Sequence, residues 1–517
     1  MSKAEEFLHF IVILLFSAVV FSGCVREDEF AQGDYVRLKF SSDTITFDTV
    51  FTTVGSVTKK LMVYNTENEP VKIDRICLVH GANSYYRLNV DGSTDLVVKD
   101  VEIAAKDSMF IFVRTEINPN NLSNPLLIYD SIAFHFNEKS QYVRLEAYGQ
   151  DAYFHKPDHF LLSLNTQTNR YDTIRYSLAH QNCENRGIEV EGNQIYWKTD
   201  KPHVILGVCA VDSAYTLNLG NNARLYFDKN SEFWVYNAAT LKAEADREAP
   251  VVFQGMRLDE YYHNVPSQWN CIRFMAGSKD NVLDNVVIKN NVIGLIVDTC
   301  VNSSPTLTIN NTRIENCSNI GLYARGAKVE GKNVIVQNCG SYAVALTLGG
   351  SYEFIHCTFA NYWNYSTRTD ACLILNDYYV DVYDAVQYRE IERANFHNCI
   401  IYGSLSEDEI EFDLLNGNVG NIYFGNCLLK YGKWQNYSSI FTNCIFNQSP
   451  LFVDASNGDV SLQSTSPAIG RGDGVWSYTV PYDINGMYRN DPPCIGALEY
   501  VPSTDRRAFG ILKKKRK

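Results

Sequence analysis

The chain has few cations for its size and no Cys-x-x-Cys pair. Its 46 lysines and arginines are outnumbered by 59 aspartates and glutamates, which gives a formal net charge of −13. Nucleic-acid binding needs a basic surface, so this balance argues against nucleic acid as a partner. Without Cys-x-x-Cys among its 14 cysteines, the sequence lacks a common spacing of zinc ligands. We therefore expect neither a metal nor a cofactor.

The composition indicates a large, β-rich core. The chain has 517 residues, of which 45% are hydrophobic and 13% aromatic, and this content excludes wholesale disorder. The 33 tyrosines and 27 phenylalanines far exceed the 6 methionines, which favours strands. The length suits two or three domains, or one elongated repeat domain with a smaller one.

An apolar run near the start predicts an export signal. Residues Phe7–Gly23 are short for a membrane-spanning helix but typical of a signal-peptide core. The run ends in Phe21-Ser22-Gly23-Cys24, which resembles the lipobox of bacterial lipoproteins. The resemblance implies a signal peptide over 1–23 and acylation of Cys24. An uncleaved anchor helix is the alternative.

The residues after Cys24 give a further indication of location. Val25–Glu29 has one cation followed by acids, which resembles the surface-export signal of Bacteroides-type lipoproteins. Several acyl chains together hold a protein on a membrane. We therefore expect an outer-membrane protein at the cell surface, anchored by its N-terminal lipid through a tether over 24–34.

Residues 35–152 predict an Ig-like β-sandwich. Apolar and polar residues alternate in short runs, as in Val71–Leu78, and turn signals such as Asp91-Gly92 separate the runs. Six or seven short strands in this length suit an Ig-like module, which serves as a spacer or a binding unit. The predicted strands are Tyr35–Phe40, Lys60–Tyr64, Val71–Leu78, Met109–Arg114, Ser131–Phe136 and Tyr142–Ala147.

A short phrase repeats from about residue 281: an apolar residue, any residue, Asn, then usually Cys. Its successive Asn or His positions are 26, 22, 18, 42, 28 and 17 residues apart. A period in the low twenties fits a leucine-rich repeat or a parallel β-helix. Because the leucine-rich consensus and helical segments are absent, the pattern favours a β-helix, with 42 covering two turns around a strand at Ala371–Leu375. The repeated residues are Asn290, Asn316, Cys317, Asn338, Cys339, His356, Cys357, Asn398, Cys399, Asn426, Cys427, Asn443 and Cys444.

These residues predict a structural ladder rather than a metal site. Asn tolerates the left-handed backbone of a sharp bend, and stacked Asn side chains can hydrogen-bond from turn to turn. A Cys after the bend would face inward, where this small side chain is often buried. A metal site is the alternative, but each Cys lies about one turn from the next.

The two ends of the repeat carry motifs of a known family. Pro202–Gly207 and Pro250–Gly255 resemble the opening turns of pectate-lyase-like right-handed β-helices, whereas Ser464–Gly470, Asp483–Arg489 and Ile495–Tyr500 resemble a C-terminal closing segment. Over about residues 200–500 the chain resembles right-handed parallel β-helix surface lipoproteins of Bacteroides-type bacteria. This implies an all-β chain. Its expected parts after the sandwich are 153–199, a connecting or capping segment; 200–465, the β-helix; 466–502, the closing segment; and 503–517, a basic tail.

No catalytic residues emerge from the sequence. The acidic set of polygalacturonase-like sites is absent, and a shared scaffold does not carry its chemistry along. Calcium-dependent elimination would need Asp residues and a base. Asp280, Asp284 and Asp298 with Arg313 and Arg325 are the only such set that one face might gather.

Aromatic residues are the candidate ligand-binding side chains. Exposed aromatics can stack on sugar rings, and the insert at 367–393 could roof a groove; the alternative is that these rings fill the core. The candidates are Tyr362, Trp363, Tyr365, Tyr378 and Tyr379. We expect non-catalytic binding of a polysaccharide, a surface glycan or another surface component. The alternatives are a polysaccharide lyase or glycoside hydrolase, and a structural or adhesive stalk.

Overall fold

The computed structural model describes two compact units, Met1–Gln150 and Asp151–Lys517. Within them it describes residues 29–51, 58–115, 126–165, 170–181, 183–258, 260–299, 305–381, 383–406 and 408–502. The predicted signal peptide, Cys24 and the basic tail lie outside these ranges. Among the described residues, no helix combines the length and the apolar character needed to cross a membrane.

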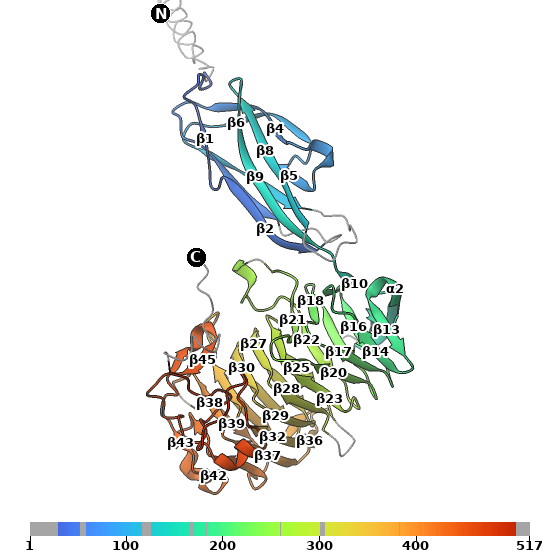
Figure 1. Ribbon diagram of the computed structural model, residues 1–517, viewed down its shortest axis with the longest axis vertical. Helices are drawn as coiled ribbons and strands as arrows, with labels where there is room; N and C mark the ends of the chain where they lie inside the picture. The colour runs from blue at the N-terminus through green and yellow to red at the C-terminus, as the bar shows by residue number, and fades with distance from the viewer. Residues whose placement is uncertain are drawn as a thin grey trace, which may run out of the picture. The chain divides into compact units, whose positions relative to one another are not determined.

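The described part of the first unit consists of two facing sheets (Figure 1). One sheet has the order β1-β3-β7-β5 and the other β2-β9-β8-β4-β6. All pairings are antiparallel except β2 with β9, which is parallel. The strands are β1 Leu38–Phe40, β2 Thr44–Phe51, β3 Lys59–Asn65, β4 Val71–Leu78, β5 Tyr86–Val90, β6 Val97–Ile103, β7 Ser108–Thr115, β8 Leu126–Phe136 and β9 Lys139–Gln150.

Alternation along the strands builds one core between these two sheets. Leu61 and Val63 of β3 face Ile132 and Phe134 of β8 in a single hydrophobic cluster, and all four are fully buried. Such period-two burial is what the sequence pattern predicts for strands with one wet face. Each of the six predicted strands coincides in part with an observed one, while β2, β5 and β6 lie between them.

The second unit is built on three long parallel sheets (Figure 1). Sheet 1 contains β10 Tyr153–His155, β15 His203–Ile205, β18 Arg224–Phe227, β21 Val251–Gly255, β24 Val286–Lys289, β27 Arg313–Cys317, β30 Ile335–Cys339, β33 Thr358–Asn361, β38 Ile400–Gly403, β41 Leu428–Leu429 and β43 Ile445–Phe446. Sheet 2 contains β11 His159–Asn165, β12 Arg170–Leu178, β16 Val208–Val211, β19 Glu232–Val235, β22 Cys271–Phe274, β25 Leu295–Val297, β28 Leu322–Arg325, β31 Val344–Thr347, β34 Leu373–Asn376 and β39 Ile410–Asp413. Sheet 3 contains β13 Ile188–Glu191, β14 Gln194–Trp197, β17 Thr216–Leu219, β20 Thr240–Glu244, β23 Asn281–Asp284, β26 Leu307–Asn310, β29 Lys328–Lys332, β32 Gly350–Ile355, β37 Ile391–His397, β40 Ile422–Gly425 and β42 Phe441–Thr442.

The chain visits these sheets in turn, so that each strand pairs in parallel with the strand one turn later. Ile288 of β24, for example, lies beside Ile314 of β27, which lies beside Val336 of β30. Like residues therefore stack along the interior, and a single hydrophobic cluster runs from Ala179 to Ile440. This architecture is consistent with a β-helix.

The parallel sheets begin earlier than the sequence motifs indicate. β10, β12 and β14 already pair in parallel with β15, β16 and β17, so the segment 153–199 provides the first turn. It also protects two sheet edges, because β11 and β13 pair antiparallel with β12 and β14. The sequence placed the start at residue 200 because its Pro-initiated motif begins there.

The C-terminal segment covers one side of the coil. The last parallel strand is β43, at Ile445–Phe446, rather than near residue 465. Beyond it, buried residues such as Ile484 and Ile495 pack against outward-facing Ile335 and Ile400 of sheet 1. This segment includes the antiparallel pair β44 Phe452–Asp454 and β45 Asp459–Leu462, and the 3-10 turns η4 Ala455–Asn457 and η5 Gly474–Tyr478.

The repeated Asn-Cys phrase occupies two separate bends. The first column, at the bend from sheet 1 to sheet 2, contains Asn290, Asn316 and Asn338. The second column, at the bend from sheet 3 to sheet 1, contains His356, Asn398, Asn426 and Asn443, and earlier turns continue it with Asn285, Asn311 and Asn333. All ten have φ between 46° and 65°. Each position therefore adopts the left-handed backbone that Asn tolerates.

The 42-residue spacing corresponds to one turn of the coil. β32 pairs directly with β37, which places Phe354 beside Phe396. The turn contains a strand, β34, close to the predicted Ala371–Leu375, and then an inserted hairpin of β35 Tyr378–Val380 and β36 Val386–Tyr388. The prediction of two turns was wrong because an insertion lengthens a repeat as much as an extra turn does.

Side chains within each column hydrogen-bond from turn to turn. The Asn333 Nδ2 atom donates to Asn311 Oδ1 at 3.0 Å, and Asn398 Nδ2 lies 3.0 Å from His356 Nε2. In the first column, Asn316 Nδ2 and Asn290 Oδ1 are 3.4 Å apart. These bonds satisfy amides that the bends would otherwise leave without partners.

The cysteines after the bends point into the core. Cys317, Cys339, Cys357, Cys399 and Cys427 are fully buried, and all are free thiols. Burial raises the pKa of the Cys339 and Cys357 thiols, and a protonated thiol is a poor nucleophile. Cys444, in the last turn of the second column, is only partly buried.

We expect the five buried thiols to resist modification in the folded protein. Treatment with 5,5′-dithiobis(2-nitrobenzoate) should label them at least about 100-fold more slowly than in 8 M urea, because labelling then requires opening of the core. Mass spectrometry of the labelled peptides measures each site, with half-buried Cys183 as the internal control. Fast labelling of Cys399 in buffer would contradict the inward placement.

Two buried histidines in the first turns give the second unit a sensitivity to acid. His155 Nε2 and His203 Nδ1 are 2.9 Å apart, His203 Nε2 donates to the Lys198 carbonyl at 2.7 Å, and both rings stack on Trp197. Burial lowers the pKa of His203 to about 4 and lowers that of His155 well below its usual range. Both rings are therefore neutral when folded.

We expect the stability of the second unit to fall as the pH falls from about 6.5 toward 4. Across that window the unfolded chain binds a proton at His203 that the folded chain does not, and this costs about 2 kcal/mol at pH 5 relative to pH 7.5. Urea unfolding of the native protein and of His203→Gln measures the effect, since the variant should have a flatter pH profile. Parallel profiles would contradict the assignment.

Candidate functional site

The outer surface of sheet 2 carries a row of outward-facing side chains. Trp234, Arg273, Ile296, Tyr323, Ala345, Ile374 and Glu411 lie on successive strands in direct register. Trp234, Ala345 and Ile374 are nearly buried, whereas Arg273, Ile296 and Tyr323 are half-exposed. We call the half-exposed middle of this row, together with Asp298 and Arg325, the sheet-2 face.

A charged cluster lies on the sheet-2 face. Asp298 Oδ2 is 3.3 Å from Arg273 Nε, and its Oδ1 accepts from Arg325 Nε at 2.6 Å. The Arg325 guanidinium also lies 5.5 Å from the centre of the Tyr323 ring. The carboxylate thus fixes two guanidinium groups beside an aromatic ring, with one net positive charge.

The acidic set considered from the sequence is not brought together. Asp298 and Arg325 meet, but Asp284 belongs to sheet 3, where its Oδ1 accepts from the Asn311 amide at 2.9 Å. Arg313 belongs to sheet 1 and donates to Asn485 Oδ1 at 3.2 Å. Asp280, which precedes β23, has φ of 52° at a bend. The structure therefore places these side chains on different faces.

One border of the sheet-2 face is formed by the loop after β21 and by residues after β33. Tyr365 Oη donates to the Asn264 carbonyl at 2.9 Å, so that loops four turns apart meet. Tyr365 is 52% exposed and its ring centre lies 5.0 Å from that of Trp363, which is 8% exposed. Tyr261, in the 3-10 turn η2 Glu260–Tyr262, adds a 77% exposed ring to the same loop.

The inserted hairpin β35–β36 forms the opposite border. Tyr378 Oη donates to Asp413 Oδ1 at 2.9 Å, and this bond with the carboxylate charge raises the pKa of Tyr378. Arg389, just after β36, donates to Thr299 Oγ1 at 3.1 Å. Tyr379 projects from the hairpin and is 48% exposed.

The predicted aromatic residues are thus divided among three environments. Trp363 and Tyr365 lie at one end of β34, and Tyr378 and Tyr379 lie at its other end, so these four flank sheet 2. Tyr362 instead packs against Phe452 beneath the C-terminal segment, with ring centres 6.1 Å apart. Of the five, only Tyr365 and Tyr379 are well exposed; Trp363 and Tyr378 act chiefly through the contacts described above.

Sequence reasoning missed Arg273, Tyr323 and Tyr261. The alternation in Cys271-Ile272-Arg273-Phe274 and in Leu322-Tyr323-Ala324-Arg325 does contain the signal, because apolar residues there alternate with an arginine or tyrosine. Which of the many outward residues share a face depends on the register between turns, and one sequence does not give that register.

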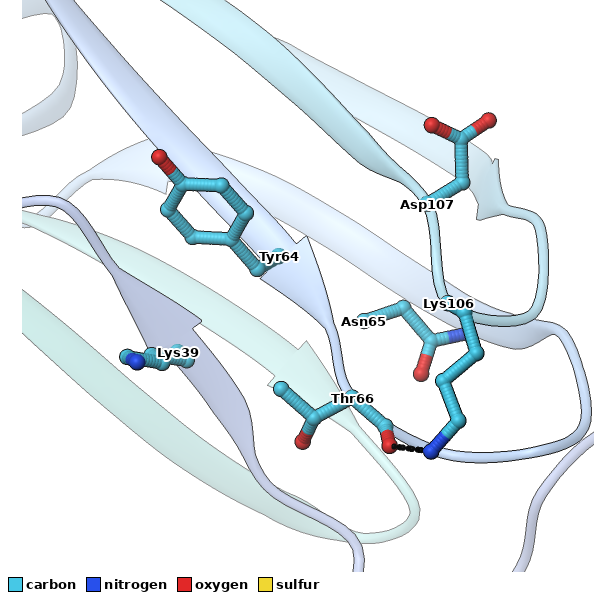
Figure 2. Close-up of a pocket in the computed structure, with 6 residues that line it drawn as sticks. All are labelled: Lys39, Tyr64, Asn65, Thr66, Lys106 and Asp107. Atoms are coloured by element: carbon cyan, nitrogen blue, oxygen red, sulfur yellow. Dashed lines mark hydrogen bonds between the residues drawn. The ribbon is translucent and has the colours of Figure 1, made fainter.

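Two small cavities lie elsewhere. One of about 350 Å³ in the first unit is lined by Lys39, Tyr64, Asn65, Thr66, Lys106 and Asp107 (Figure 2). The other, of about 290 Å³, lies between the coil and the C-terminal segment and includes Arg247, Asp284, Lys332 and Tyr482. Throughout the described ranges, no cluster of three or more His, Cys, Asp or Glu side chains could hold a metal ion.

Comparisons with known proteins leave the family open. No family model matches the chain, and no curated protein matches it. A family 123 glycoside hydrolase from Clostridium perfringens shares 10% identity and a TM-score of 0.16, over 22% of this chain and 27% of that one. A protein of unknown function from Porphyromonas gingivalis W83 shares 13% identity and a TM-score of 0.17, over 25% and 56%.

A PapD-like domain of human CEP192 gives a similarly weak match. It shares 13% identity and a TM-score of 0.16, over 25% of this chain and 95% of that domain. The chain thus spans about a quarter of the matched hydrolase and just over half of the Porphyromonas protein. At such low scores the matches carry no argument about function.

Proposed function

We propose that the protein is a lipid-anchored surface protein whose coil binds a glycan without turnover. In this proposal Cys24 is acylated, the first unit is an Ig-like module, and the second is a right-handed β-helix of the surface lipoproteins of Bacteroides-type bacteria. The protein is then held on the outer membrane at the cell surface. One observation carries the binding function: the pair of guanidiniums that Asp298 orients beside Tyr323.

The chemistry of this cluster suits a sugar ligand. Planar guanidiniums donate to hydroxyl, carboxylate or sulfate oxygens, and an accessible tyrosine ring offers an apolar surface to one side of a sugar ring. The exposed rings of Tyr365 and Tyr379 on opposite borders extend that surface.

The same cluster favours binding over catalysis. Glycoside hydrolysis ordinarily uses two carboxyl groups flanking the scissile bond, and elimination needs a group free to remove a proton. On the sheet-2 face, Asp298 is bound to two arginines, which hold it ionised and sterically occupied.

Binding is tested with glycan arrays followed by calorimetry of the best ligand. We expect Tyr323→Ala and Arg273→Ala each to weaken binding at least about fivefold, which corresponds to about 1 kcal/mol of lost stacking or hydrogen bonding. The matched control is Tyr196→Ala on β14, whose ring is 41% exposed on sheet 3; it should bind normally.

Three other outcomes would overturn this proposal. New reducing ends or unsaturated products would indicate a hydrolase or a lyase. Array silence together with cell adhesion would indicate a structural stalk. Equal losses in Tyr196→Ala and Tyr323→Ala would place the ligand away from the sheet-2 face.

A further inference from the structure

The four-stranded sheet of the first unit presents a basic and aromatic outer face. Alternate residues point away from the core, and register sets Lys39 beside Tyr64, Met62 beside Phe110, and Lys60 beside Phe112. Arg87 and Arg114 form a further pair at the other end of the face. We call this surface the basic face; its outward residues are Lys39, Lys60, Met62, Tyr64, Arg87, Asn89, Ser108, Phe110, Phe112 and Arg114.

The charge of the basic face is not compensated. β1, β3, β5 and β7 contain no Asp or Glu, in a chain of net charge −13. Within the described residues, Lys39, Lys60, Arg87 and Arg114 form no ion pair, and all four are exposed. Four cations thus share one small sheet without a carboxylate.

The opposite sheet of the same unit is balanced. There Lys72 pairs with Asp100 at 2.9 Å, and Arg144 lies 3.7 Å from Glu146. The contrast shows that the positive charge belongs to one face rather than to the unit as a whole. An ordinary solvated surface mixes both signs, so the basic face is unusual within this molecule.

The centre of the basic face is apolar. Phe110 is 47% exposed and Phe112 is 38% exposed, and their ring centres are 5.1 Å apart. The Lys60 ammonium lies 5.1 Å from the centre of the Phe110 ring. Half-exposed Met62 lies next to Phe110, so the cations surround an apolar patch.

The 350 Å³ cavity continues the basic face at the end formed by Lys39 and Tyr64 (Figure 2). Lys106 adds a fifth cation there and donates to the Thr66 carbonyl at 2.6 Å. Asp107 is the one carboxylate that lines the cavity. The cavity therefore keeps a net positive charge, with Tyr64 as its aromatic wall.

We propose that the basic face docks onto a membrane surface of anionic lipids. Lysine and arginine side chains near such a surface each contribute about 1 kcal/mol of attraction, and exposed Phe and Met side chains insert among the headgroups. The cavity beside Lys39 and Lys106 takes a phosphate headgroup. This inference is independent of glycan binding by the second unit.

The apolar centre distinguishes a membrane from other polyanions. A nucleic acid or an acidic polysaccharide needs cations with polar partners or stacking rings, and gains little from a Phe-Phe-Met patch that remains wet at its edges. A lipid interface desolvates that patch and places the cations among phosphates. Charge complementarity and apolar burial thus favour the same occupant.

The test is sedimentation of the chain from Val25 onward, which contains every described residue, with lipid vesicles. In 50 mM salt we expect binding to vesicles of 70% phosphatidylcholine and 30% phosphatidylglycerol, and at least tenfold weaker binding to phosphatidylcholine alone. Lys60→Glu/Arg114→Glu should reduce binding to the anionic vesicles at least tenfold, and Phe110→Ser/Phe112→Ser at least fivefold. All four positions are exposed, and unchanged circular dichroism and melting temperatures check the fold.

The matched control is Lys72→Glu/Arg144→Glu on the opposite sheet, which should bind anionic vesicles within twofold of the native chain. Equal losses in both charge-reversal variants would overturn the proposal, as would equal binding to both vesicle types. Binding to immobilised heparin without binding to anionic vesicles would also overturn it and would assign the face to a polyanionic chain. Glycan-array results for Tyr323→Ala bear on neither outcome, so the two proposals fail separately.

Discussion

Replacing Arg489 by alanine is expected to destabilise the second unit by about 3–5 kcal/mol. Its side chain is fully buried and donates to Glu499 Oε1 at 3.0 Å and to Asn333 Oδ1 at 2.6 Å. Glu499 Oε1 also accepts from the Cys494 amide at 2.9 Å. Removing the arginine leaves a buried carboxylate without its cation, and such a loss is typically worth this much.

Urea unfolding measured by tryptophan fluorescence gives the free energy of unfolding of each variant. Arg471→Ala, which removes an exposed arginine of the same segment, is the control and should change stability by less than about 0.5 kcal/mol. The double variant Arg489→Met/Glu499→Leu should recover much of the loss, because no unpaired charge is then buried. A single Arg489→Ala variant as stable as the native chain would contradict the buried pair.

The second large effect is expected at Arg368, which joins two loops of neighbouring turns. Its guanidinium donates to both carboxylate oxygens of Glu409, at 2.9 and 2.7 Å, and to the Asn361 carbonyl at 2.9 Å. The side chains of Arg368 and Glu409 are 2% and 0% exposed. We expect Arg368→Ala to cost about 3–5 kcal/mol in the free energy of unfolding.

Arg368→Lys separates geometry from charge. A lysine keeps the positive charge but lacks the planar pair of donors, so it should recover only part of the loss. Lys433→Ala serves as the control, because Lys433 forms an exposed ion pair with Asp408 at 3.5 Å, and such pairs contribute less than about 1 kcal/mol. Comparable melting temperatures for Arg368→Ala and Lys433→Ala would refute the prediction.

The parallel architecture could be predicted from local chemistry. A sharp bend needs a left-handed residue in every turn, and Asn supplies it at Asn316 and Asn398 alike. The sequence therefore indicated the coil and its period. It did not reveal that Asn338 and His356 belong to different bends, because both bends impose the same backbone conformation and so select the same residue type.

The candidate site was less accessible to prediction. Tyr362 and Trp363 are adjacent in sequence, yet one packs beneath the C-terminal segment and the other borders sheet 2. Nothing local distinguishes them, since the covering segment comes from about 90 residues later and its docking depends on tertiary contacts. Likewise, Asp298 meets Arg273 only through the register of neighbouring turns.

The C-terminal segment also bears on how the coil comes apart. Solenoids held only by neighbour contacts can fray turn by turn. Here Tyr482 accepts from Asn333, Asp473 accepts from Asn398, and Asn485 accepts from Arg313, so one strap fastens several turns at once. Loosening any one of them then strains the rest, and pulling on the C-terminus would release the turns as a block in a single mechanical event.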